Sequence, residues 1–251
     1  MLKRLVFAAA GLLLAHHSAQ AEGNPLPLCP GIAQVMAADP LLRDAFKAAY
    51  PNIAERKGKK AVSEPCVYPF QAILYESAVV LLTLGQIPGE ACHSCGAKIS
   101  AVFLQWNGSA LTPVGRHDEF TETGTFGSAR VVTPIRLGAD DGVVLQESGT
   151  FQGITSSSIR PFVFQGEQAK PLEPQEGIPS GFTDCGAKVD GKRCSDIDAT
   201  WWVDPGGRLL VTYSGTWVDK SKAFGTVVYK RKGDALVIVS GAKIAADRNE
   251  P

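Results

Sequence analysis

The sequence is poor in histidine, in long apolar runs and in net charge. It contains four histidines, and its 25 basic and 25 acidic residues give a formal net charge of zero. A chain without excess positive charge is not expected to bind nucleic acid or an anionic membrane surface. Beyond Ala21 no apolar run approaches the roughly 20 residues of a membrane-spanning helix, so no membrane span is expected.

Motifs of common enzymes are also missing. The chain has no G-x-S-x-G elbow, no H-E-x-x-H pair, no P-loop and no G-x-G-x-x-G turn. We therefore expect no cofactor and no metal ion, and we favour a protein that is not an enzyme.

Residues 1–21 are typical of a secretory signal peptide. Two basic residues precede the apolar run Leu5–Ala15, and the small residues Ala19 and Ala21 fit a signal-peptidase site. We predict export to a periplasm or to the medium, with cleavage following Ala21. Cleavage would remove two basic residues and no acidic one, giving a net charge of −2, and would leave only His93 and His117 as histidines.

The cysteines all lie in the part predicted to be exported, where an even number usually forms disulfides. Six cysteines allow fifteen connectivities. Proximity along the sequence favours the pairs Cys29–Cys66, Cys92–Cys95 and Cys185–Cys194.

Residues 22–67 are expected to form a helical and loop cap. The pattern predicts a short helix over Ile32–Ala38 and an amphipathic helix over Pro40–Pro51, whose apolar side chains follow helical spacing. Asp39 is suited to cap the second helix, because its carboxylate accepts hydrogen bonds from first-turn amides. The polar stretch Glu55–Glu64 predicts a surface loop.

From residue 68 onward the chain repeats itself at intervals of about 65 residues. Each copy has apolar runs rich in Val, Ile, Thr and aromatic residues, separated by Gly-containing turns, which is typical of consecutive β-strands. The copies cover residues 68–114, 128–174 and 198–241, and residues 242–251 form a tail.

We predict a mainly β fold of three tandem four-stranded antiparallel meanders, propeller-blade-like but open or incomplete, with a short N-terminal helical cap. The closing turns NGSAL, GEQAKPL and GDALVIV resemble those of propeller-type repeat proteins. Closed propellers have about four to eight blades, so three copies should not close a ring. A β-sandwich or barrel built from the same strands is the alternative.

The segment Cys92–Cys95, with the sequence CHSC, is the sharpest local motif. A redox-active dithiol needs its first cysteine at the N-terminus of a helix, whereas this segment leads into a predicted strand. A zinc site would need a second ligand pair, for which His117 and Cys185 are candidates. We interpret the motif as a disulfide-closed β-turn, and His93 as a candidate binding residue.

Acidic residues gather in two further stretches. Those around the Cys185–Cys194 turn do not match the spacing of a calcium loop and are expected to be solvated; they are Asp184, Asp190, Asp196 and Asp198. The triplet His117-Asp118-Glu119 places a base beside two carboxylates. Neighbouring residues of a strand face opposite sides, so we predict a surface loop here and keep His117 as a candidate binding residue.

Tryptophans are the remaining candidates for contact with a ligand, because exposed aromatic side chains are common at binding surfaces. Trp201 and Trp202 are consecutive on a predicted strand, so one should face each side of the sheet. Burial as core aromatics between stacked blades is the general expectation for tryptophan, and contact with a ligand is the alternative, for which Trp201 and Trp202 are the candidate binding residues.

These observations favour an exported, disulfide-stabilised β-repeat binding protein without catalytic activity. Its partner would be another exported protein or a glycan, and an inhibitor or immunity-type partner of an exported enzyme is one form of this hypothesis. A secreted glycan hydrolase is one alternative; its carboxylates would come from Asp118, Glu119, Asp140, Asp141 and Glu147. A structural or assembly component of the envelope is the other alternative.

Overall fold

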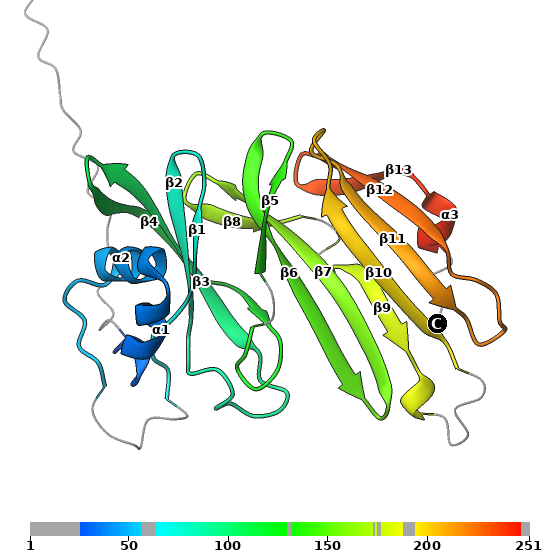
Figure 1. The fold of residues 1–251 in the computed structure, drawn as a ribbon, viewed down its shortest axis with the longest axis horizontal. Coiled ribbons are helices and arrows are strands. Elements are labelled where there is room, and N and C mark those ends of the chain that lie inside the picture. The colour runs from blue at the N-terminus through cyan, green and yellow to red at the C-terminus, as the bar shows by residue number, and fades with distance from the viewer. Residues whose placement is uncertain are drawn as a thin grey trace, which may run out of the picture.

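The computed structural model describes residues 26–56, 64–129, 132–172, 174, 177–187 and 194–246. The predicted signal peptide and its cleavage site lie outside these residues, as do Asp190 and most of the predicted loop at 55–64. Within the described part the protein is mainly β, with antiparallel sheets and a short helical part (Figure 1). A search of these residues finds no helix with the length and apolar character needed to cross a membrane.

The two N-terminal helices are confirmed as α1 (Ile32–Ala38) and α2 (Pro40–Ala49), the second ending two residues earlier than predicted. Asp39 caps α2, because its Oδ1 accepts a hydrogen bond from the Leu42 amide at 3.0 Å. Leu42 and Phe46 are buried against the first sheet. The Cys29–Cys66 disulfide, buried in the same cluster, fastens the start of the cap to the beginning of the sheet.

The first sheet consists of four consecutive strands paired in order: β1 (Tyr68–Leu74), β2 (Ala78–Leu84), β3 (Ala97–Asn107) and β4 (Ala110–Thr123). Alternation along β2 gives each face its own role. Val79 and Leu81 pack against the helices, whereas Val80 and Leu82 pack against the second sheet. Because both faces are covered, β2 is an almost continuous apolar run.

The second sheet contains the remaining strands: β5 (Val132–Leu137), β6 (Asp140–Phe151), β7 (Ile154–Gln165), β8 (Gln168–Pro171), β9 (Ile178–Thr183), β10 (Asp196–Val203), β11 (Leu209–Thr216), β12 (Gly225–Lys232) and β13 (Ala235–Ser240). The sheet branches at β7. Residues 162–165 of β7 pair with β8, and residues 155–159 pair with β9, which continues to β10–β13. A 3-10 helix, η2 (Cys185–Ala187), follows β9.

The described strands form three packed layers, visible from one side to the other in Figure 1. The layer β5–β7 lies in the middle. Its Val143 packs with the first sheet, and its Val144 packs with β10–β13. Trp201 and Tyr213 belong to the second of these cores. The apolar segment 143–145 is therefore buried on both sides, which explains why it does not alternate.

The structure departs from the sequence-based expectations in several places. The strands of the second and third copies share one sheet, because β9 joins them, and β9 was not expected. Its sequence IPSGFT contains a proline and a glycine, which disfavour a strand interior. Residues 242–246, assigned to the tail, form α3 (Ala242–Ala246). Neither sheet closes into a barrel within the described residues. The likeness to propeller blades stays a prediction.

Candidate functional site

The four residues predicted to bind a ligand do not come together. His93 is exposed in the Cys92–Cys95 turn, with its ring centroid 4.8 Å from that of Phe126. His117 is half-buried, and its Nδ1 accepts a hydrogen bond from the Ala169 amide at 3.1 Å. The predicted loop around His117 is wrong, because residues 110–123 form strand β4. A β-bulge opposite residues 99–101 shifts its register there.

The two tryptophans do share one site. Trp201 packs against the core between the second and third layers, and Trp202 is 44% exposed on the opposite face, as the alternation predicts. Both line a cavity of about 690 Å³ between β5 and β10. We call it the strand slot; its other lining residues are Thr133, Pro134, Ile135, Arg136, Gly138, Val203, Asp204, Pro205 and Gly207.

A larger cleft of about 1370 Å³ lies at the opposite ends of the strands. Serine is its commonest lining residue, so we call it the serine cleft. The serines are Ser94, Ser148, Ser156, Ser157, Ser158, Ser195 and Ser221, and the charged residues are Glu122, Glu147, Asp184, Asp219, Arg160 and Lys222. The four acids and two bases give the lining a net charge of −2, which suits a neutral or basic partner.

Arg160 joins three strands at this cleft. It extends from β7, forms an ion pair with Glu147 of β6, and donates from Nη2 to the Thr121 hydroxyl at 3.1 Å and to the Glu122 carbonyl at 2.8 Å, both in β4. Its guanidinium carbon lies 5.9 Å from the ring centroid of Phe162. Charge-assisted hydrogen bonds of this kind fix the side chain and hold the first two layers together.

The other wall of the serine cleft is held by Ser195, which is 4% exposed. Its amide donates to Asp184 Oδ1 at 2.7 Å, and its hydroxyl accepts from the Val218 amide at 3.0 Å. Beside this wall, the rings of Phe182 and Trp217 contact each other with centroids 6.5 Å apart. The wall therefore combines a fixed backbone with an aromatic pair.

Disulfides close loops on both sides of the serine cleft. The structure contains the three pairs favoured from the sequence, Cys29–Cys66, Cys92–Cys95 and Cys185–Cys194. Ser94 lies inside the second loop, and the third begins next to Asp184. The Cys95 amide donates to the Cys92 carbonyl at 3.0 Å, which is the hydrogen bond of the predicted β-turn.

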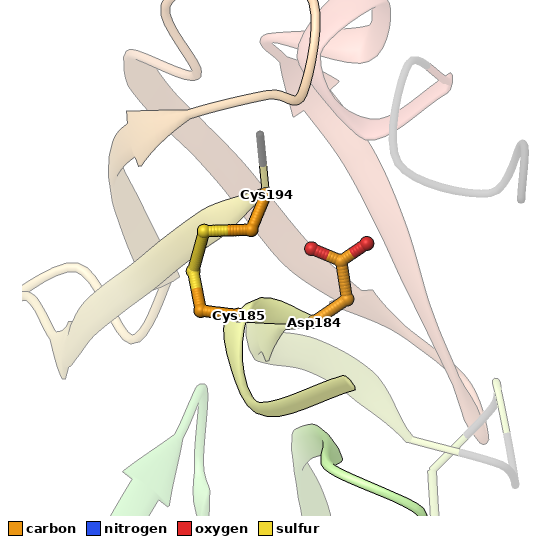
Figure 2. Close-up of side chains that lie close together, drawn as sticks. All are labelled: Asp184, Cys185 and Cys194. Atoms are coloured by element: carbon orange, nitrogen blue, oxygen red, sulfur yellow. A yellow bond between two sulfur atoms is a disulfide. The ribbon is translucent and has the colours of Figure 1, made fainter. Parts of the chain in front are cut away.

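Asp184, Cys185 and Cys194 place potential metal-ligand atoms within 4.8 Å of one another. Figure 2 shows that the two sulfur atoms are bonded to each other and that the Asp184 carboxylate lies beside them. A disulfide sulfur lacks the negative charge of the thiolate that binds zinc. In this oxidised state the cluster is a structural link.

The carboxylates considered for glycan hydrolysis each contact a cationic side chain. Their partners are Arg116 for Asp118, Lys98 for Glu119, Arg231 for Asp140, Arg136 for Asp141 and Arg160 for Glu147. Glu147 alone among them lines the serine cleft. It is joined there by Glu122, whose Oε1 accepts from the Gly96 amide at 3.1 Å.

Sequence reasoning missed the serine cleft. Serine occurs at many surface turns, so its presence alone carries little information. One signal was available: Ser156, Ser157 and Ser158 occupy three successive positions of a strand whose other half is strongly apolar. A strand that loses its apolar face midway has lost its packing partner there, and a cleft begins at that point.

The described residues form a mainly β protein with two cavities, of which the serine cleft lies beside two disulfide-closed loops. No family model, curated protein or solved structure matches this chain.

Proposed function

We propose that this chain is an exported, disulfide-stabilised β-repeat protein that binds a partner without catalysing a reaction, with the serine cleft as its binding site. The observation that carries the proposal is a cleft of about 1370 Å³ lined by serines and flanked by two disulfide-closed loops. Pockets for small molecules measure about 300–1000 Å³ and are lined mainly by apolar side chains. This cleft is larger than that range, which suits a macromolecule, and we propose another exported protein.

Rigid walls support this proposal. Arg160 fixes one wall through its bonds to β4 and β6, and Ser195 fixes the other through Asp184 and Val218. A site that is already ordered loses little conformational entropy when it binds, which raises affinity. Blade-like repeats that present loops at one end would give the partner a broad surface.

Gly149 offers a test that leaves the backbone unstrained. It lines the serine cleft on β6, and a Cβ added to it would meet no atom within 4 Å. Gly149→Trp should therefore fill the cleft without disturbing the fold. We expect the exported protein to retain a stoichiometric protein partner from an envelope and secreted extract in high salt, and the variant to lose at least 90% of it.

Gln105→Trp is the matched control, because Gln105 is exposed on β3 and does not line the serine cleft. This variant should retain the partner as the wild type does. Equal retention by Gly149→Trp and the wild type would remove the cleft from the proposal, and binding lost equally in both variants would point to a general surface effect.

Glycan hydrolysis is the second candidate function, favoured by one observation. Glu122 and Glu147 line the same cleft, and Arg160 contacts the carboxylate of one and the carbonyl of the other. An enzyme of this type needs two carboxyl groups across one bond. Turnover of a glycan panel that is abolished by Glu147→Gln and by Glu122→Gln would replace the binding proposal with this one.

A further inference from the structure

The strand slot lies between two strand edges that have no partner among the described residues. β5 ends the second sheet and pairs only with β6. β9 covers β10 only at residues 196–198, so residues 199–203 of β10 pair with β11 alone. Residues of both edges line the same cavity of about 690 Å³.

The pairing pattern shows which backbone groups point into the strand slot. Leu137 and Asp140 flank a two-residue turn, so they form a hydrogen-bonded pair, and alternation then turns the backbone groups of Arg136 away from β6. Pro134 shares this outward orientation. A proline without an N–H is tolerated at such a position on an edge strand.

The same reasoning applies to β10. The Asp204 amide donates to the Arg208 carbonyl at 3.0 Å, so even-numbered residues of β10 bond to β11. The N–H and C=O groups of Trp201 and Val203 then point away from β11, on the side where β9 pairs only with residues 196–198. Ala199, of the same parity, donates its N–H to the neighbouring Asp198 side chain at 2.9 Å, as expected of an amide without a strand partner.

The two edges also run in the same direction. β5 ends at the turn of Gly138 and β10 ends at the turn of Gly207, and these turns touch, since a Cβ on Gly207 would lie 2.4 Å from the Gly138 nitrogen. One segment running away from this contact would be antiparallel to both edges. Its side chains would alternate between Trp201 with Ile135 on one face and Trp202 on the other.

We propose that the strand slot binds an extended segment of a partner protein by strand addition, with main-chain hydrogen bonds to β5 and β10 on its two sides. Backbone groups recognise an extended chain irrespective of sequence, and the flanking side chains select an apolar residue at alternate positions. A segment that forms backbone hydrogen bonds to β5 on one side and β10 on the other must not be paired with any other strand. An edge strand of a folded sheet, such as β13 of a second copy, has one free edge and is the less suitable occupant.

Arg136 allows the backbone contribution to be isolated. Its N–H points into the slot rather than toward β6, so Arg136→Pro removes one slot donor without removing a bond of the sheet. Arg136→Ala removes the same side chain and keeps the N–H, which makes it the matched control. Thermal unfolding of both variants checks that each is folded.

The probe is a display library of linear twelve-residue peptides, selected on the immobilised exported protein. We expect selected peptides to bind Arg136→Ala within threefold of the wild type and Arg136→Pro at least tenfold more weakly. Two synthetic versions of a selected peptide, N-methylated on its odd or on its even residues, should each bind the wild type at least tenfold more weakly, because alternate amides of the segment donate to β5 and to β10. This second measurement decides the matter if Arg136→Pro does not fold.

Three results would overturn the proposal. The first is a library that yields no peptide, and the second is peptides that bind both variants equally and tolerate N-methylation. The third is a concentration-dependent dimer in sedimentation that Arg136→Pro abolishes, because it would assign the slot to a second copy. None of these depends on Gly149→Trp, so the strand slot and the serine cleft are tested separately.

Discussion

Arg231 of β12 and Asp140 of β6 form an ion pair although they are 91 residues apart in the sequence. Asp140 Oδ2 also accepts a hydrogen bond from the Gln165 side chain at 3.2 Å. Two hydrogen bonds hold the pKa of the Asp140 carboxyl below its usual value. The one from Arg231 has the larger effect and the one from Gln165 the smaller. The pair connects the third layer of strands to the middle layer.

Asp140→Asn should lower the free energy of unfolding at pH 7 by about 0.2–1 kcal/mol, the range measured for solvent-accessible ion pairs. Because the pKa of Asp140 is lowered in the folded state, its stabilisation is full above the ordinary carboxyl pKa of about 4 and is lost as the pH falls through the folded pKa. Urea unfolding at pH 7 and at pH 2 measures this. The exposed Asp234 supplies the control Asp234→Asn, and a loss independent of pH would contradict the prediction.

Removal of the Cys29–Cys66 disulfide should cost more stability than removal of Cys92–Cys95. The first closes a sequence separation of 37 residues and the second a separation of 3. Chain-entropy estimates are about 4 and about 2 kcal/mol. Denaturant unfolding of the two double alanine variants measures the difference, and equal losses would show that chain entropy does not dominate here.

Graded reduction should open the disulfides in a fixed order. Cys29 and Cys66 are fully buried, whereas Cys92 is exposed, so a reductant reaches Cys92–Cys95 first. Alkylation followed by peptide mass spectrometry gives the order. We also expect no reactive thiol in the native protein, since the structure pairs every cysteine. Alkylation of Cys29 before Cys92 would contradict the prediction, because it would show that the Cys29–Cys66 disulfide is accessible to the reductant.

Two glycines of β6 should respond to alanine in opposite ways. A Cβ on Gly142 would lie 2.0 Å from the Phe162 carbonyl oxygen, whereas one on Gly149 would meet nothing within 4 Å. We expect Gly142→Ala to destabilise the protein by more than about 2 kcal/mol, because the backbone of β7 must move. Gly149→Ala should be neutral or stabilise by up to about 1 kcal/mol. Thermal unfolding of both variants measures the two changes in stability, and both substitutions lie in the same strand.

Arg160→Met should destabilise the protein by about 2 kcal/mol, since charge-assisted hydrogen bonds that join layers are lost. Arg208→Met is the control: Arg208 pairs with Asp204 within one turn, and its side chain is 50% exposed against 21% for Arg160. We expect no measurable change for the control. Equal denaturation midpoints for the two variants would show that Arg160 does not hold the layers together.

Several elements were predictable from the sequence because their causes are local. Asp39 and the apolar spacing after Pro40 specify α2, and the alternation at Trp201 and Trp202 gives one buried and one exposed ring. The disulfide pairs followed from proximity. β9 was missed because its proline and glycine argue against a strand, and only its position between β7 and β10 makes it one.

The candidate sites were predictable only in part. Trp201 and Trp202 are candidate contact residues from the sequence and both line the strand slot. The slot is also lined by Pro134 and Arg136, which lie about 66 residues earlier in the sequence. His93 and His117 line neither cavity. The ion pair of Arg160 with Glu147 pairs two strands at a register that no local pattern specifies.

The sequence by itself determined most of the strands, the helical cap and the two short disulfide loops, because alternation, capping and short loops depend on neighbouring residues. The pair Cys29–Cys66 then followed as the remaining one. The tertiary structure alone decided that β5–β7 lie between two other layers, and that residues of two strand edges, on β5 and β10, line one cavity. Such features depend on the number of residues over which two neighbouring strands stay paired before they separate. That length is set by the packing of whole layers, in which residues far apart in the chain compete for the same apolar contacts.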